Sequence, residues 1–329
     1  MQASRQWVGN RFGTIVRPAP PEPREPMPLL EFFCSKEGRK PLRPLPSVDP
    51  REGWKVHPST DLRVTWLGHS TLLMELDGYR LLTDPMWGKR ASPTRWFGPR
   101  RFQPVPVPLT ALPPLDAVLI SHDHYDHLDY PTIRVLAKRD VPFVAPLGVG
   151  AHLECWGIAP ERITELDWWE TTEVRGGGPL ITATPAQHFS GRTPATRNHT
   201  LWASYVIEGP EQRVFFGGDS GMMPGFASIG ERFRPFDLVC LEIGAYHPAW
   251  GDIHLGPANA LAALDALGGG PLLPIHWATF DLATHRWDQP IEVLMEAGKE
   301  SGAELLTPPL GEPTEPRLEE GPRLWWRGL

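Results

Sequence analysis

Short apolar runs separated by turn residues recur from Arg63 to His276, and this pattern constrains the fold more than any other feature of the chain. Runs of this length bounded by Gly, Pro, Asn and Asp are typical of strands. Three longer windows carry apolar residues at helical spacing, each with Pro at an early position, where its missing N–H costs little. Strands that alternate with helices predict an α/β protein.

The predicted elements fall within one domain over residues 56–310. The predicted strands cover 63–68, 71–76, 80–85, 117–122, 143–148, 180–186, 202–208, 213–219, 237–242 and 272–276. The predicted helices cover 131–139, 256–267 and 290–302.

The two ends of the chain lack this pattern. Residues 1–55 are rich in Pro and charge and predict an N-terminal arm without a core of its own, and residues 311–329 predict a surface tail. Within the arm, Leu29, Leu30, Phe32 and Phe33 form an apolar cluster. Such clusters mark interaction surfaces, so we expect the arm to dock on its own domain or on a second subunit of a homodimer. Contact with a membrane or lipid is the alternative.

Charge and composition exclude several classes of protein. A net charge of -7 and a pI near 6.0 argue against nucleic acid as a partner, because such binding needs cationic surface. No apolar stretch reaches the roughly 18 residues that span a bilayer, and the first residues lack the apolar core of a secretory signal. We expect a cytoplasmic protein, with peripheral contact at the inner membrane surface as the alternative. Cys34, Cys155 and Cys240 predict reduced, structural thiols.

The strongest signal for chemistry is a group of four ligand-type side chains that begins at the end of the predicted strand 117–122. His122, His124, Asp126 and His127 lie within six residues. Imidazole and carboxylate without thiolate suit Zn²⁺, and also Fe or Mn. The alternative is a polar, solvated loop.

Three further candidates also lie at the ends of apolar runs: His188, Asp219 and His276. Ligands in open α/β folds gather at the carboxyl ends of strands, so these side chains should converge on one site. We assign His122, His124 and His188 to one ion and Asp126, His127 and His276 to another, with Asp219 bridging the two. Two ions about 3.5–4 Å apart stabilise both the attacking and the leaving oxygens of a displacement.

This ligand set resembles that of the metallo-β-lactamase superfamily, which implies an αββα sandwich with two metal ions along one edge. A series of blocks in order resembles the N-acyl-phosphatidylethanolamine phospholipase D branch of that family. The blocks are WLGHST at 66–71, LLTDP at 81–85, RASP at 90–93, GPRRF at 98–102, LISHDHYDHLDY at 119–130, ELDWWE at 165–170, TPAQH at 184–188, GGDSG at 217–221, FDLVCLEIGAY at 236–246 and PIHWATF at 274–280.

The resemblance also implies supporting roles. Asp84 matches an acidic residue that braces the metal-binding loop, and the alternative is a turn-forming Asp before Pro85. His254 matches a histidine near the substrate, and the alternative is a surface His before a helix. Asp126, Asp219 and His254 are therefore the predicted catalytic residues.

Other histidines and the tryptophan pair carry less weight. His69 is equally compatible with packing and with the site, and the sequence predicts packing for Trp168 and Trp169. Structural roles are predicted for His57, His152, His199 and His285. His247 and Ser190-Gly191 depart from the branch near the expected substrate entrance, which leaves the head group open.

The function predicted from these residues is metal-dependent hydrolysis of a phosphodiester in a small-molecule or lipid substrate, after the manner of the phospholipase D branch. The main alternative is a lactonase or related cyclic-ester hydrolase, because the ascorbate-6-phosphate lactonase branch resembles this chain in the same ligands. A nuclease of this fold needs a basic groove or an RNA-binding domain, which the sequence lacks. A metal-stabilised binding module is the non-enzyme alternative, although open adjacent metal sites stabilise poorly.

Overall fold

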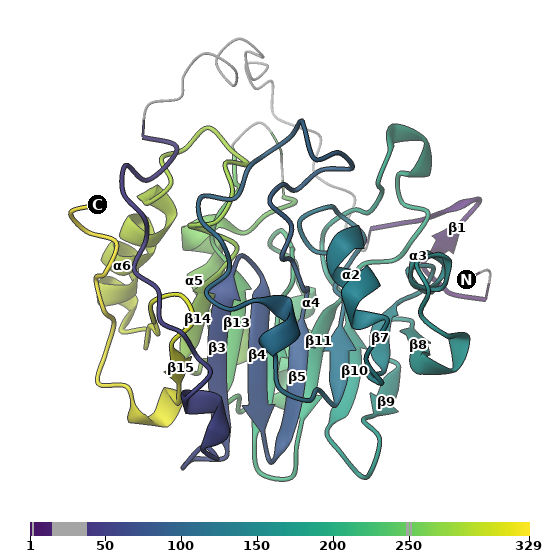
Figure 1. Ribbon diagram of the computed structural model, residues 1–329, viewed down its shortest axis with the longest axis horizontal. Coiled ribbons are helices and arrows are strands. Elements are labelled where there is room, and N and C mark those ends of the chain that lie inside the picture. Colours follow the sequence, from purple (N-terminus) through teal and green to yellow (C-terminus); the bar gives the residue numbers. More distant parts are fainter. Residues whose placement is uncertain (2, 15–37, 248–249, 251) are drawn as a thin grey trace.

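The computed structural model describes residues 1, 3–14, 38–247, 250 and 252–329, and two β-sheets lie face to face at its centre (Figure 1). The first sheet has the order β15-β3-β4-β5-β6-β7-β8 and the second β14-β13-β12-β11-β10-β9. The first comprises β3 Leu62–Gly68, β4 Thr71–Leu76, β5 Tyr79–Thr83, β6 Ala117–Leu119, β7 Phe143–Pro146, β8 Ile163–Leu166 and β15 Pro313–Thr314. The second comprises β9 Thr171–Glu173, β10 Leu180–Thr184, β11 Ser204–Glu208, β12 Arg213–Phe216, β13 Leu238–Glu242 and β14 Leu272–Ile275.

Helices cover the outer face of each sheet. Against the first sheet, Ile133 and Leu136 of α2 and Leu153 of α3 pack in one cluster with Leu82 and Val118. Against the second sheet, α5 contacts β13 and packs between α4 and α6. The helices are α2 Tyr130–Leu136, α3 Gly150–Cys155, α4 Gly225–Phe233, α5 Gly256–Leu267 and α6 Gln289–Ser301, with 3-10 turns η1 Gly53–Lys55, η2 Leu109–Ala111, η3 Pro160–Arg162, η4 Pro194–Thr196 and η6 Pro316–Leu318. The predicted αββα sandwich is confirmed.

All ten predicted strands and all three predicted helices are present, with ends shifted by a few residues. The elements that were not predicted are strands β1 Trp7–Val8, β2 Arg11–Phe12, β8, β9 and β15 and helices α3 and α4. Strands β8 and β9 are short and mostly half-exposed, so they lack the continuous apolar run that marks the other strands. Helix α3 has only six residues, too few for a helical period to stand out.

The two ends of the chain differ from expectation. Within the arm, β1 Trp7–Val8 and β2 Arg11–Phe12 form a hairpin whose Phe12 is buried in the main core. The prediction of a surface tail over 311–329 is wrong, because this segment packs against the sandwich. Strand β15 pairs with β3, and Trp326, 1% exposed, packs edge-on against Trp277. The apolar cluster Leu29, Leu30, Phe32 and Phe33, like Cys34, lies outside the described residues.

The two described cysteines also behave differently. Both are free thiols, but Cys240 is buried in β13 whereas Cys155 is exposed at the end of α3, so a buried structural role holds for Cys240 alone. Among the described residues no helix has the length and apolar character needed to cross a bilayer.

Strand direction gathers the chemistry at one edge. Strands β5, β6, β7 and β8 run parallel, as do β12, β13 and β14, and two antiparallel pairings bring β10 into the direction of β12. Carboxyl ends of parallel strands meet at the same edge of a sheet, so loops after β5, β6, β10, β12 and β14 approach one another.

Candidate metal centre

All seven predicted ligands converge at this edge, in loops that follow the ends of strands. The loop after β6 carries His122, His124, Asp126 and His127, and His188, Asp219 and His276 follow β10, β12 and β14. Their donor atoms form overlapping groups in which all atoms lie within 4.8 Å of one another. The structure therefore brings together every residue that the sequence proposed as a ligand.

The first group consists of three imidazoles: His122, His124 and His188. Nδ1 of His124 lies 2.8 Å from Nε2 of His122 and 3.2 Å from Nε2 of His188. Nitrogen ligands about 2.0–2.1 Å from a tetrahedral ion stand about 3.3 Å apart, so this spacing suits three nitrogens around one cation. Burial lowers the pKa of all three rings, which favours the neutral form that binds metal.

The second group contains the predicted Asp126, His127 and His276, and also His69. Oδ2 of Asp126 lies 2.9 Å from Nε2 of His69 and 3.5 Å from Nε2 of both His127 and His276. His69 sits in the turn between β3 and β4 with φ 56°, and its carbonyl accepts a hydrogen bond from His276 N–H. Of the two readings open for His69, the structure favours membership of the site.

Asp219 lies between the two groups. Its Oδ2 is 3.1 Å from Nε2 of His127 and 3.2 Å from Nε2 of His276. The same oxygen is 3.8 Å from Nε2 of His188 and 3.9 Å from Nε2 of His122. One buried carboxylate therefore faces two imidazoles of each group, which is the position predicted for a bridging ligand.

Unpartnered polar atoms test whether cations fit here. Within the described residues, Nε2 of His127, Nε2 of His276 and Oδ1 of Asp219 are buried without a hydrogen-bond partner. Nε2 of His127 and His276 are near Asp219 Oδ2, yet neither contact has hydrogen-bond geometry. Buried polar atoms are rarely left unpaired, and donors that converge without pairing suit a cation between them. The clusters are consistent with a dinuclear metal site, and their donors do not select among zinc, iron and manganese.

Electrostatics lead to the same conclusion. Burial would lower the pKa of His276, but the charge of Asp219 and the nearness of the Asp126 and Asp219 carboxylates to its Nε2 raise it to about 10. Burial would likewise raise the pKa of Asp219, but the charges of His127 and His276 hold it well below its usual range. In the metal-free protein, protons on His127 and His276 therefore supply the positive charge that bound cations would supply.

Asp84 supports the loop that carries the first ligands, as the resemblance implies. Its Oδ2 lies 2.8 Å from Nδ1 of His127 and accepts a hydrogen bond from Ser121 Oγ at 2.6 Å, while Oδ1 accepts one from Ser121 N at 2.7 Å. A carboxylate on Nδ1 fixes the tautomer of a histidine so that Nε2 faces the ligand site. The alternative of a simple turn residue does not explain these contacts.

His254 also lies at the site rather than on the open surface. Its ring centroid is 5.1 Å from that of His188 and 5.4 Å from that of His276. Its Nδ1 is 2.5 Å from Oε2 of Glu242, the last residue of β13. Glu242 was not predicted as a site residue, although it lies at the end of an apolar run as the predicted ligands do.

A second ring of contacts fixes the segments on either side of the ligands. The guanidinium of Arg192 stacks on Tyr125 at 4.0 Å and donates hydrogen bonds to the carbonyls of Asp123 and Leu128, which bracket His124–His127. Gly191, at φ 130°, donates its N–H to Asp123 Oδ1 at 2.6 Å. A Cβ at Gly191 would lie 2.8 Å from the Cα of Arg197, so the glycine that departs from the branch fits this close approach.

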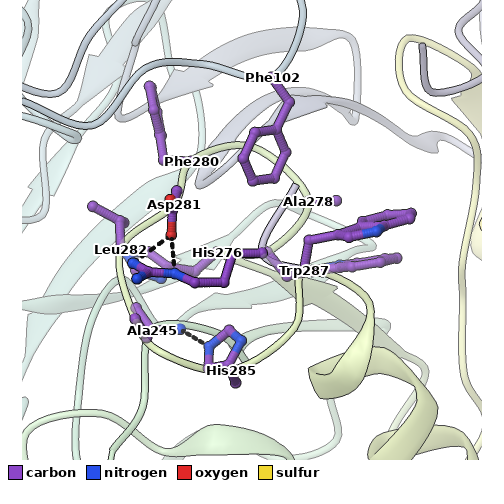
Figure 2. A pocket seen from close by; sticks show the side chains of 12 residues that line it. Phe102, Ala245, His276, Ala278, Phe280, Asp281, Leu282, His285 and Trp287 are labelled. Atoms are coloured by element: carbon purple, nitrogen blue, oxygen red, sulfur yellow. Dashed lines mark hydrogen bonds and ion pairs between the residues drawn. The ribbon is translucent and has the colours of Figure 1, made fainter. Parts of the chain in front are cut away.

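The wall behind His276 is closed by the segment that follows β14. A hollow of about 20 Å³, room for about one water molecule, lies there, and Phe102, Phe280 and Trp287 are among the side chains that line it (Figure 2). Arg39, within the predicted arm, also lines the hollow and pairs with Asp281 at 2.6 Å. The hollow is too small for a substrate, so it supports His276 rather than admitting a ligand.

The remaining histidines and tryptophans lie where structural roles were predicted. None of His57, His152, His199 and His285 belongs to a ligand group among the described residues. His285 Nε2 accepts a hydrogen bond from Ala245 N–H, and His152 faces Asp123 at 3.5 Å. Trp168 is buried and donates to the carbonyl of Trp202, and Trp169 contacts Arg232.

Comparison with known proteins agrees with this geometry. Residues 79–277 match a family model described as a beta-lactamase superfamily domain. The chain is 45% identical over 312 residues to an uncharacterised protein of Mycobacterium tuberculosis, covering 92% of this chain and 82% of that protein. It is 37% identical over 238 residues to N-acyl-phosphatidylethanolamine-hydrolyzing phospholipase D 1 of Caenorhabditis elegans, covering 69% of this chain and 67% of that protein.

Among solved structures, a metallo hydrolase from the archaeon Ignicoccus hospitalis shares the fold, with a TM-score of 0.59 at 21% identity over 77% of this chain and 97% of that one. The family model covers more than half of the chain, and it includes all seven converging ligands. The chain therefore belongs to the metallo-β-lactamase superfamily, as a metal-dependent hydrolase with a His/Asp metal site.

Proposed function

We propose that this hydrolase cleaves phosphodiester bonds, and that its substrate is an N-acylated phospholipid split into phosphatidic acid and a fatty acyl amide alcohol. The observation that carries the proposal is the position of Asp219, whose Oδ2 lies within 4 Å of two imidazoles from each ligand group. Two ions held side by side by these groups would stabilise both the attacking and the leaving oxygens of an in-line displacement at phosphorus. The printed name of the Caenorhabditis elegans relative supports the substrate class.

The ligand groups define where two zinc ions, or iron or manganese in their place, would bind. His122, His124 and His188 would hold one ion, and Asp126, His127 and His276 the other. Bound ions of this kind supply Lewis acidity, which activates water near neutral pH and neutralises charge that develops on phosphoryl oxygens. Asp219 would balance both positive charges from between the groups.

His254 is the proposed proton donor for the leaving oxygen. Glu242 holds its Nδ1 at 2.5 Å, which orients the ring and leaves Nε2 as the nitrogen available to a substrate. A positioned imidazole contributes typically 10²–10⁴-fold when it transfers a proton to a reacting group. Because Glu242 is itself buried, its contact with His254 fixes the ring more firmly than solvent would.

A substrate panel tests the proposal. Purified protein is assayed with N-acyl-phosphatidylethanolamine in mixed micelles, a soluble chromogenic phosphodiester and a lactone, with Asp219→Asn as the inactive reference. We expect phosphatidic acid and the acyl amide alcohol from the lipid, and slower turnover of the soluble diester. Efficient lactone hydrolysis with no cleavage of either diester would overturn the proposal in favour of a cyclic-ester hydrolase.

A further inference from the structure

The loop between β5 and β6 holds an unusual concentration of positive charge. We call residues 87–102 the basic loop; it contains Lys89, Arg90, Arg95, Arg100 and Arg101 and no acidic residue, in a chain with a net charge of -7. The loop leaves the same edge of the sandwich as the metal centre (Figure 1). The proposed function makes no use of this charge.

The base of the basic loop is fixed to the walls of the site. Trp87 N–H donates to Thr132 Oγ1 of α2 at 3.0 Å, and Phe102 N–H donates to the carbonyl of Thr279 at 2.9 Å. Thr279 lies three residues after His276, so the loop is anchored beside a proposed ligand. Its two arms pair like a hairpin, with Ala91 N–H donating to the carbonyl of Pro99 at 3.0 Å.

The tip of the loop presents two aromatic side chains to solvent. Trp96 is 68% exposed and Phe97 is 77% exposed. Arg90 holds the backbone beneath them, because its guanidinium donates to the carbonyls of Arg95 at 3.2 Å and Gly98 at 2.6 Å. The two exposed rings therefore belong to an ordered turn. Burying them would remove a considerable apolar area from contact with water.

Exposed cations lie along the loop from its base to its aromatic tip. Lys89, Arg95 and Arg100 are exposed in the loop, and Arg95 lies over the Trp96 ring at 4.5 Å. A neighbouring groove of about 510 Å³ is lined on its other side by residues 40–44, including an exposed Lys, an exposed Arg and Leu42 at 92% exposure. Among the described residues, no acidic side chain lines this groove, so its lining is cationic.

We propose that the basic loop, together with residues 40–44, docks the protein on an anionic phospholipid surface, with Trp96 and Phe97 entering the headgroup region. Aromatic side chains favour the membrane–water interface, and Lys and Arg are attracted to anionic lipid. The remainder of the chain carries the excess of negative charge, so this face would be the one that approaches the bilayer. Docking would turn the metal-site edge toward the membrane.

Lipid suits this surface better than a second protein does. The two rings stand at the tip of a narrow hairpin, whereas a stable protein interface needs a broad patch of roughly 800 Å² on each partner. Apolar anchoring and positive charge together are the combination that holds a peripheral protein on a membrane. The inference rests on the proposed lipid substrate, because that substrate gives the reason for docking. Docking itself is measured by an experiment that involves no turnover of substrate.

Vesicle co-sedimentation of the full chain tests the proposal. Wild-type protein should bind vesicles of phosphatidylcholine with phosphatidylglycerol more tightly than vesicles of phosphatidylcholine alone, and added salt should weaken binding. Trp96→Ser with Phe97→Ser should weaken binding at least about tenfold. Arg95→Gln with Arg100→Gln should weaken binding to the anionic vesicles about 30-fold, since each cation contributes about fivefold.

Two controls keep the outcomes distinct. Val56→Ser with Leu318→Ser removes exposed apolar side chains near the start of β3, at the opposite edge of the sandwich, and should leave vesicle binding unchanged. The loop variants should turn over a soluble diester as the wild type does. If the proposed function is wrong, the diester assay shows it, whereas vesicle binding is unaffected. The docking proposal is overturned if the wild-type protein does not bind anionic vesicles. Loop variants that bind anionic vesicles as the wild type does also overturn it, and loss of a wild-type oligomer in those variants would assign the loop to a protein contact instead.

Discussion

The loop after β6 and the loop after β5 leave neighbouring parallel strands at one edge of the first sheet, yet they are built in opposite ways. In the first, His122 and His127 are buried and Asp84 holds His127 through a charged contact. In the second, Trp96 and Phe97 are exposed and backbone carbonyls bound by Arg90 hold the turn. The difference teaches that the chemistry and the surface contact rest on separate interactions, so each should be removable without the other.

The strongest way to break the buried side of this comparison is Asp219→Asn. The change keeps the side-chain volume but removes the charge that faces both imidazole groups. We expect a loss of at least about 10²-fold in kcat for a soluble diester, the scale for disrupting a preorganised electrostatic site. Asp265→Asn, on the exposed face of α5, is the matched control and should keep full activity. Wild-type turnover by Asp219→Asn would exclude the bridging role.

A smaller effect is expected from Asp84→Asn, which alters support rather than a ligand. Asp84 has φ 35°, a region that Asn tolerates, so the backbone should hold while the charge opposite His127 is lost. Loss of such an outer partner typically lowers metal affinity 10–100-fold, measured by competition with a chelating dye. Asp77→Asn is the control, because Asp77 has φ 50° and binds backbone N–H groups of 211 and 212 away from the site. Equal affinities in the two variants would show that Asp84 merely forms a turn.

Protonation gives a third test of the buried loop. In the metal-free protein His127 and His276 have raised pKa values, that of His276 reaching about 10, so their protonated pairing with Asp219 stabilises the fold fully below the unfolded pKa. This contribution is lost as pH rises through the folded pKa. Metal must displace these protons, so zinc added at pH 7 should release at least one proton per chain, and apparent affinity should rise with pH toward 10. Proton release is measured with an indicator dye in weak buffer, and affinity that is flat with pH would refute the assignment.

The smallest effect concerns the exposed loop and separates order from charge. Arg90→Gln removes the guanidinium that binds two backbone carbonyls, whereas Lys89→Gln removes one exposed charge without such contacts. Because one hydrogen bond contributes about 1 kcal/mol, Arg90→Gln should weaken binding to anionic vesicles a further two- to fivefold beyond Lys89→Gln. Identical binding by the two variants would mean that the order of the tip is irrelevant and charge alone matters.

The sequence predicts the sandwich and the ligands for the same physical reason. Buried strands need continuous apolar runs, and a ligand at the end of such a run is easy to recognise, as with His188 and His276. Glu242 was not recognised as a site residue because it is still part of its strand. Its role depends on its contact with His254, which approaches from another loop. Contacts of this kind depend on tertiary packing, which one sequence read without alignment does not encode locally.

The ends of the chain show a second limit. The segment 311–329 reads as a tail because Pro and Glu dominate it, yet Trp325 and Trp326 bring it onto the sandwich beside Trp277. A few large aromatic side chains outweigh a polar composition because each buries so much apolar area. The arm was misread in the same way, because Phe12 and Trp7 pack its short hairpin against the core.

Metal content tests the central claim most directly. Protein purified without any chelator is analysed by inductively coupled plasma mass spectrometry, and the metal-to-protein ratio is followed through dialysis against a chelator together with hydrolysis of a soluble diester. The two converging ligand groups predict close to two transition-metal ions per chain, with activity lost as the ions leave and restored when they return. The account would be contradicted by protein that was never exposed to a chelator, carries no metal and still hydrolyses the diester.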